Sequence, residues 1–107
     1  MIEKELIYID SWYDVPNKYT GKAKLPNGIA FFKNGKLHNK NEPALAYENG
    51  TSYWCINGLN HRLDGPAIYN SIEIISFYIN GEKYLEQEYW DHPLVIECKL
   101  NSILSIT

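Results

Sequence analysis

The chain has 107 residues, a net charge of −3 and no run of basic residues longer than two. These values favour one small domain and argue against a nucleic-acid-binding protein, which usually carries a basic stripe. No apolar run approaches the roughly 18 residues of a membrane span. The opening stretch MIEKELIYID lacks the apolar segment of a signal peptide, and the two cysteines form no CxxC motif. We therefore expect a cytoplasmic protein with reduced thiols.

Aromatic residues make up 14% of the chain, with nine Tyr and three Trp. Tyr and Trp combine an apolar ring with a polar tip, so they suit half-exposed sheet faces and interfaces. Composition alone is equally compatible with rings that fill a thin core. A binding surface and a core-filling role are therefore both open.

Residues 1–19 are predicted to form an N-terminal cap of a single domain that spans residues 1–107. Within the cap, Leu6–Asp10 alternates apolar and polar residues, as a strand does. We expect this strand to pack on the first unit of the repeat that follows, because the end of a repeat array otherwise exposes an apolar edge.

A 23-residue repeat occupies residues 20–81. Asn-Gly recurs at Asn34, Asn57 and Asn80, and an aromatic residue stands three positions before each. An Asn-Gly pair flanked by apolar residues is a strong β-hairpin signal, because both residues tolerate the positive φ of a type I′ turn. The repeat is therefore expected to fold as successive hairpins.

A second Asn-Gly series, at Asn27 and Asn49, separates the two strands within a unit. The predicted strand pairs are Lys22–Leu25 with Ile29–Lys33, Ala44–Glu48 with Thr51–Ile56, and Ala67–Asn70 with Ile74–Ile79. A single hairpin is not stable alone, so the units must stack side by side. We expect a mainly β fold: an elongated antiparallel sheet of about three stacked hairpins, with a short C-terminal capping helix.

The repeat resembles a known family in its register Gly-Pro-Ala…Tyr…Asn-Gly…Tyr-Trp…Asn-Gly…His-Arg…Asp-Gly-Pro-Ala. This order resembles the MORN repeat, in a variant form found in phage, giant-virus and bacterial proteins. The resemblance covers residues 20–84 and is best in Pro43–Gly65. It departs from the pattern at residues 21–23, where Gly-Lys-Ala replaces Gly-Pro-Ala, and at residues 41–42, where Asn-Glu replaces Asp-Gly. It implies an elongated sheet of hairpins and an interaction module, sometimes linked to lipid or to toxin–antitoxin pairs, without implying a reaction.

Residues 82–107 are predicted to form a C-terminal cap. Residues 82–91 are good helix formers, and Pro93 ends that helix because the residue before a proline is pushed out of the helical region. The following LVIECKL alternates with a period of two, which predicts a strand and leaves a helix open. The tail at residues 101–107 is apolar for a terminus, and with the open sheet edges it leaves a homodimer open.

The period of two also assigns the two aromatic ladders to opposite faces of the sheet. The more apolar ladder is predicted to be core: Phe31, Trp54, Ile56, Phe77 and Ile79. The ladder formed by Phe32, Cys55 and Tyr78 is predicted to lie on the exposed face, because a thin sheet cannot bury both faces. The predicted binding residues are Phe32, His38, Tyr53, His61, Arg62 and Tyr78.

His38 and His61 occupy equivalent positions one repeat apart, where two imidazoles could hold a metal. A third ligand is missing, because Tyr84 takes the next equivalent position. His61, Arg62 and Asp64 could also form an acid–base cluster, but general acid–base catalysis needs groups that converge on one pocket. We therefore expect no catalytic residue, no metal site and no cofactor.

These features predict a non-enzymatic module that binds another protein. The resemblance further implies a phage or bacterial accessory protein that neutralises a toxin or a host-defence component. The alternative is a protein that sequesters a small, nucleotide-like ligand between aromatic and Arg side chains. An enzyme of hydrolase or nuclease type is disfavoured, because no convergent constellation is evident.

Overall fold

The computed structural model describes residues 6–72 and 74–105. Within these ranges the chain is mainly β, with a nine-stranded mixed sheet and a second sheet of two strands. The strands are β1 (Ile7–Tyr8), β2 (Gly21–Leu25), β3 (Gly28–Lys33), β4 (Lys36–Leu37), β5 (Leu45–Tyr47), β6 (Ser52–Tyr53), β7 (Cys55–Ile56), β8 (Leu59–Asn60), β9 (Ile68–Tyr69), β10 (Ile75–Ile79) and β11 (Glu82–Tyr84). The helical segments are the 3-10 helix η1 (Trp12–Asp14), α1 (Glu86–Trp90) and α2 (Pro93–Leu104).

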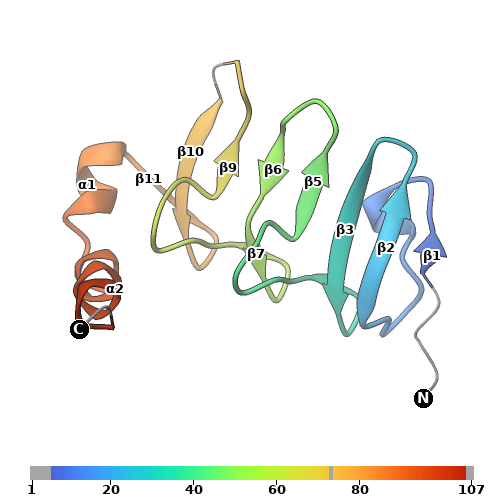
Figure 1. Ribbon diagram of the computed structural model, residues 1–107, viewed down its shortest axis with the longest axis horizontal. Coiled ribbons are helices and arrows are strands. Elements are labelled where there is room, and N and C mark those ends of the chain that lie inside the picture. The colour runs from blue at the N-terminus through green and yellow to red at the C-terminus, as the bar shows by residue number, and fades with distance from the viewer. Residues whose placement is uncertain (1–5, 73, 106–107) are drawn as a thin grey trace.

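The hairpins follow one another side by side along the long axis of the molecule (Figure 1). The predicted strand pairs correspond to β2–β3, β5–β6 and β9–β10. Neighbouring hairpins join because β3 also pairs with β5, and β6 pairs with β9. The second strand of the middle hairpin is divided, since β7 leaves β6 and pairs with β8 instead.

The N-terminal cap packs as expected on the first hairpin. β1 pairs with β2 in parallel, with Ile7 opposite Ala23. Residues 1–5 of the predicted cap, and residues 106–107 of the predicted tail, lie outside the described residues.

The turns of the first Asn-Gly series share one backbone geometry. Asn34, Asn57 and Asn80 have φ values of 51°, 49° and 49°, and each following glycine also has a positive φ. A positive φ at both central residues is the signature of a type I′ turn. The predicted turn type is therefore confirmed for this series. In the second series Asn27 and Asn49 do not have a positive φ, so type I′ is wrong for the turns that join β2 to β3 and β5 to β6.

The nine-stranded sheet has two faces, which we name after one core residue on each. Cross-strand pairing places Ala23, Ala30, Leu45, Tyr53 and Ile68 on the Leu45 face. A cluster of buried residues covers the N-terminal half of this face: Ala23, Leu25, Ala30, Phe32, Leu37, Ala44, Leu45 and Cys55. Residues of the N-terminal segment, among them Ile7, Val15 and Tyr19, pack against this cluster.

The opposite, Phe77 face is covered at the other end of the sheet. There Phe77 and Ile79 of β10 pack against Tyr89 of α1 and Val95 of α2. Alternation along β10 places Phe77 and Ile79 on the same side as Ile75, which pairs with Tyr69. The hydrophobic core therefore changes face along the sheet.

This change of face overturns part of the predicted face assignment. Phe32 and Cys55, predicted to be exposed, are each only 4% exposed. Phe31 and Trp54, predicted to be core, are half-buried, whereas Phe77 is buried as predicted. The reason is that the terminal segments determine which face is shielded from solvent. The N-terminal segment covers the Leu45 face at one end of the sheet, and the C-terminal helices cover the Phe77 face at the other end.

The predicted strand at residues 94–100 is wrong, because these residues lie in the helix α2. Pro93 begins this helix at a position where its missing N–H costs nothing. The Nδ1 atom of His92 accepts a hydrogen bond from the backbone N–H of Leu94 at 3.1 Å, which caps the helix. The predicted short helix is α1, which starts later than expected because residues 82–84 form β11.

Candidate functional site

A hollow of about 400 Å³ opens on the Leu45 face. Its floor is apolar and includes Leu37 of β4, Leu45 of β5 and Cys55 of β7. β4 and β5 both pair with β3, so one strand positions both sides of the floor. The other residues that line the hollow are Trp12, Gly35, Lys36, Tyr47, Tyr53, Gly58 and Asn60.

Aromatic side chains form the rim of this hollow. Tyr47 and Tyr53 lie on adjacent strands, and their rings meet edge to face with centroids 6.3 Å apart. Trp12 reaches the rim from η1 and is 43% exposed. Burial, with smaller effects from the neighbouring phenols of Tyr53 and Tyr13, raises the pKa of Tyr47. Tyr47 therefore presents a neutral hydroxyl at neutral pH.

Cys55 contributes an inert thiol to the floor. Burial raises the pKa of this thiol to about 11, and its Sγ donates to Oδ1 of Asn60 at 3.4 Å. A nucleophilic cysteine needs a thiolate at working pH, so Cys55 acts here as a small apolar residue. Lys36 is the cation at the rim of the hollow.

The two repeat histidines bind the backbone of the next turn. The N–H of Asn57 donates to Nδ1 of His38 at 3.0 Å, and the N–H of Asn80 donates to Nδ1 of His61 at 2.9 Å. Both bonds span 19 residues, and the second bond lies 23 residues, or one sequence repeat, after the first. Each imidazole must be unprotonated at Nδ1 to accept such a bond.

Arg62 contacts Trp54, Asp64 and Pro66 within the fold. Its guanidinium carbon lies 3.9 Å from the centroid of the Trp54 ring. Its Nε donates to Oδ1 of Asp64 at 2.8 Å, and its Nη1 donates to the carbonyl of Pro66 at 3.1 Å. Arg62, one of the predicted binding residues, is thus stacked on Trp54, which was predicted to be core. A hollow of about 500 Å³ beside this pair is also lined by His61 and Cys98.

The structure does not bring the predicted binding residues onto one surface. Phe32 belongs to the core and contacts Tyr19 edge to face at 6.3 Å. Tyr78 is half-buried in β10, where its carbonyl accepts the N–H of Arg62 at 3.2 Å. Of the predicted set, Tyr53 alone lines the hollow on the Leu45 face within the described residues.

The rim residues Trp12, Tyr47 and Lys36 were not predicted to bind. The alternation of Leu45 with Tyr47 along one strand was a usable signal, because it places both side chains on one face. Trp12 and Lys36 reach the hollow through the path of the chain between β1 and β4, which no short sequence pattern specifies.

Within residues 6–72 and 74–105, no three His, Cys, Asp or Glu side chains converge on a point that could hold a metal ion. None of the helices described there is long and apolar enough to cross a membrane. Comparison with models of protein families, with curated proteins and with solved structures finds no match to this chain.

Proposed function

We propose that this protein is a non-enzymatic binding module whose hollow on the Leu45 face receives a segment of another protein. The observation that carries the proposal is the set of half-exposed rings of Trp12, Tyr47 and Tyr53 around an apolar floor. Aromatic side chains at a concave, partly dry surface are typical anchors of protein interfaces.

The chemistry of the hollow defines the segment that would fit. A volume of about 400 Å³ accepts one or two large apolar side chains. Lys36 at the rim offers a charge-assisted hydrogen bond to a carboxylate beside those side chains. An extended or looped segment that combines apolar and acidic residues would therefore bind best.

The resemblance of residues 20–84 to the MORN repeat supports a more specific role. In this proposal the chain is a phage or bacterial accessory protein in the cytoplasm, and its partner is a toxin or a host-defence component. Occupying a partner's surface requires no chemistry from the chain itself. This fits a site in which the repeat histidines and Arg62 are held by hydrogen bonds within the fold.

The test is affinity capture with three forms of the purified chain. The wild type is compared with the double variant Tyr47→Ala/Tyr53→Ala and with Tyr69→Ala, which removes a 42% exposed ring from the Phe77 face. A protein retained by the wild type and by Tyr69→Ala, and lost with the double variant, would support the proposal. Equal retention by all three forms would contradict it.

A small ligand is the second candidate, because the hollow falls within the size range of small-molecule sites and combines aromatic rings with a cation. A planar, anionic, nucleotide-like molecule would stack on Trp12 or Tyr53 and pair with Lys36. Native mass spectrometry of the purified protein separates the two candidates. A small mass increment that disappears in Tyr47→Ala/Tyr53→Ala would favour the ligand over the protein partner.

A further inference from the structure

The helix α2 presents an apolar stripe to solvent. Ile96, Leu100 and Ile103 are 45%, 54% and 54% exposed, and their spacing places them on one side of the helix. Val95, which packs against the sheet, is 2% exposed and lies on another side. α2 therefore has an inner side that belongs to the core and an outer side that nothing in the described residues covers.

A groove lies directly beside this stripe. It has a volume of about 430 Å³ and is lined by Trp90, Val95, Ile96, Lys99, Leu100 and Ile103. The same patch thus carries both a protruding apolar ridge and an apolar hollow. Self-complementarity of this kind is what a two-fold interface between identical chains requires, because each copy supplies the ridge for the hollow of the other.

The charges on α2 are also complementary between two copies of the chain. Glu97 and Lys99 are two residues apart, which separates them by about 200° around a helix and places them on opposite flanks of the stripe. When two such helices pair in parallel about a two-fold axis, Lys99 of each copy faces Glu97 of the other. An antiparallel pair would instead oppose like charges.

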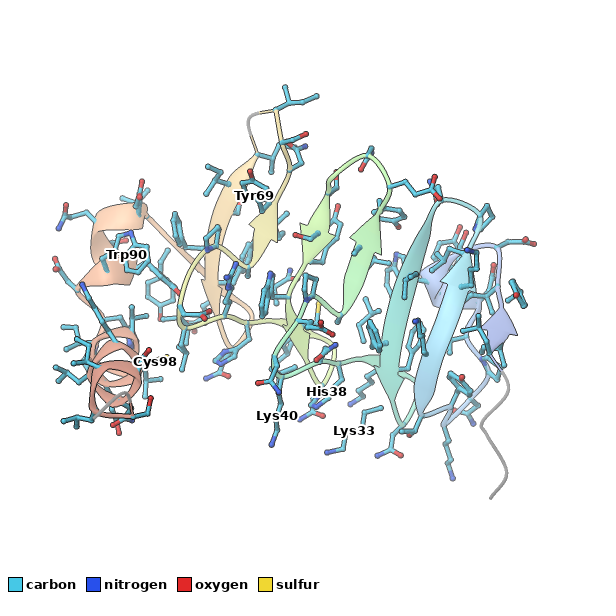
Figure 2. The ribbon with its side chains drawn as sticks, viewed as in Figure 1. Lys33, His38, Lys40, Tyr69, Trp90 and Cys98 are labelled. Carbon is cyan, nitrogen blue, oxygen red and sulfur yellow. The ribbon has the colours of Figure 1, made fainter. Side chains whose placement is uncertain are left out.

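The position of α2 leaves room for this arrangement. α2 is seen end-on at the extreme end of the molecule, farthest from the N-terminal hairpin (Figure 1). Figure 2 shows Cys98 on the side of α2 toward the sheet, with further side chains projecting outward from the helix. A two-fold axis parallel to α2 would therefore place the two sheets at opposite ends of the dimer.

From these observations we infer that the outer side of α2 is a homodimer interface, in which two copies pair their α2 helices in parallel. A membrane surface fits the stripe less well, because interfacial helices carry several basic residues on the polar face and α2 has only Lys99. The interface is separate from the hollow on the Leu45 face, so it goes beyond the proposed function and does not depend on it.

Sedimentation velocity of the full chain over a wide range of concentration tests the inference. The wild type should approach twice the 12.4 kDa of one chain. Leu100→Asp should raise the dissociation constant at least about tenfold, because the dimer would bury a carboxylate without a partner. Ile72→Asp is the matched control: it alters an isoleucine that is 83% exposed at the far end of the β9–β10 hairpin, and it should leave the dimer intact.

A charge exchange tests the direction of pairing. Glu97→Lys should weaken the dimer, and adding Lys99→Glu should restore it, because the reciprocal pairs form again with their signs reversed. A wild type that stays monomeric at every concentration overturns the inference, as does a dimer unchanged by Leu100→Asp. Binding of a monomeric chain to phosphatidylcholine vesicles would assign the stripe to lipid and also overturn it. Capture of a partner through Tyr47 and Tyr53 should be the same in Leu100→Asp, so the two proposals fail independently.

Discussion

The Nδ1 atom of His38 accepts a hydrogen bond from the backbone N–H of Asn57, 3.0 Å away and 19 residues later in the chain. The same bond joins His61 to Asn80 one repeat further on. Each histidine therefore holds the Asn-Gly turn of the next hairpin in place. The N–H of Asn34 donates instead to Oγ1 of Thr20, so a hydroxyl supports the first turn where the later turns use an imidazole.

Replacing either histidine by phenylalanine should destabilise the protein modestly. His61→Phe keeps a flat ring but removes the acceptor for the N–H of Asn80. Because Asn80 is exposed, its N–H can donate to water instead. We expect a loss of about 0.5–1.5 kcal/mol in the free energy of unfolding, measured by urea denaturation. Lys24→Ala, at an exposed position of β2, should cost much less. Equal losses in the two variants would contradict a structural role for the imidazole.

The free energy of unfolding should fall as the pH drops below about 6.5. Burial lowers the pKa of His61, and burial with the nearby Lys33 and Lys40 lowers that of His38. Figure 2 shows Lys33, His38 and Lys40 along the same edge of the molecule. Both imidazoles thus bind protons less readily in the folded state, so their contribution is complete above the ordinary value of 6.5 and is lost as the pH falls toward the lowered values.

Urea midpoints measured from about pH 8 to about pH 5 check this dependence. The double variant His38→Phe/His61→Phe should lose most of the slope between these limits, while His92 remains in both proteins. An identical slope in the wild type and the double variant would show that other groups carry the pH dependence.

Tyr89→Phe should cost more than a typical surface change. Tyr89 is 0% exposed, and its hydroxyl lies 2.6 Å from the carbonyl of Arg62, to which it donates. The same hydroxyl accepts the N–H of Gly65 at 3.1 Å. Phenylalanine would leave these groups without a partner in a buried place, at a cost of about 1–3 kcal/mol. Tyr84→Phe is the matched control, because its hydroxyl bonds to the exposed Glu82; thermal denaturation should separate the two variants clearly.

Gly28→Ala should disrupt the junction between the first two hairpins. A Cβ at this position would clash with the carbonyl oxygen of Ala46 on β5. That oxygen is backbone, so relief requires the two strands to move apart, and overpacking of this kind costs about 1–3 kcal/mol. Differential scanning calorimetry should show a lower melting temperature for Gly28→Ala than for Lys24→Ala. A melting temperature unchanged from the wild type would contradict the close approach of Gly28 on β3 to the carbonyl oxygen of Ala46 on β5.

The two cysteines should differ in reactivity. Cys55 is buried and burial raises its pKa to about 11, whereas Cys98 is half-buried. Because the thiolate is the reacting form, alkylation of the native protein should modify Cys98 well before Cys55. Peptide mass spectrometry after brief iodoacetamide treatment checks the order, and the difference should vanish in denaturant. Faster modification of Cys55 would show that the floor of the hollow opens to solvent.

Much of the fold was predictable because the turn chemistry is local. Asn-Gly and the alternation beside it depend on a few neighbouring residues, so the hairpins, and the type I′ turns at Asn34, Asn57 and Asn80, could be derived from the sequence. The face assignment failed because apolar residues occupy both sides of β3 and β7. Which side is shielded from solvent depends on where the terminal segments pack. That packing joins residues far apart in the sequence, so no local pattern specifies it. The segment at residues 94–100 failed for a related reason, since its helix is fixed by Pro93, by the His92 cap and by packing of Val95.

The candidate site was predictable only in part for the same reason. Tyr53 was identified, but its neighbours at the rim come from η1, β4 and β5, which the chain brings together across more than one turn. The pairing of Arg62 with Asp64 could be anticipated from their closeness in the sequence. The hydrogen bond from Asn80 to His61 could not, because it joins residues 19 positions apart. Polar residues in a repeat therefore need to be checked first for bonds to the next unit.

The change of face between the two hydrophobic clusters also bears on how the molecule opens. The cluster around Leu45 and the cluster around Phe77 share no residue, although they belong to one continuous sheet. We therefore expect the two clusters to open separately, with the helical end unfolding locally while the first cluster stays closed. Amide hydrogen exchange would register this as earlier loss of protection in β10 and α1 than in β2 and β3.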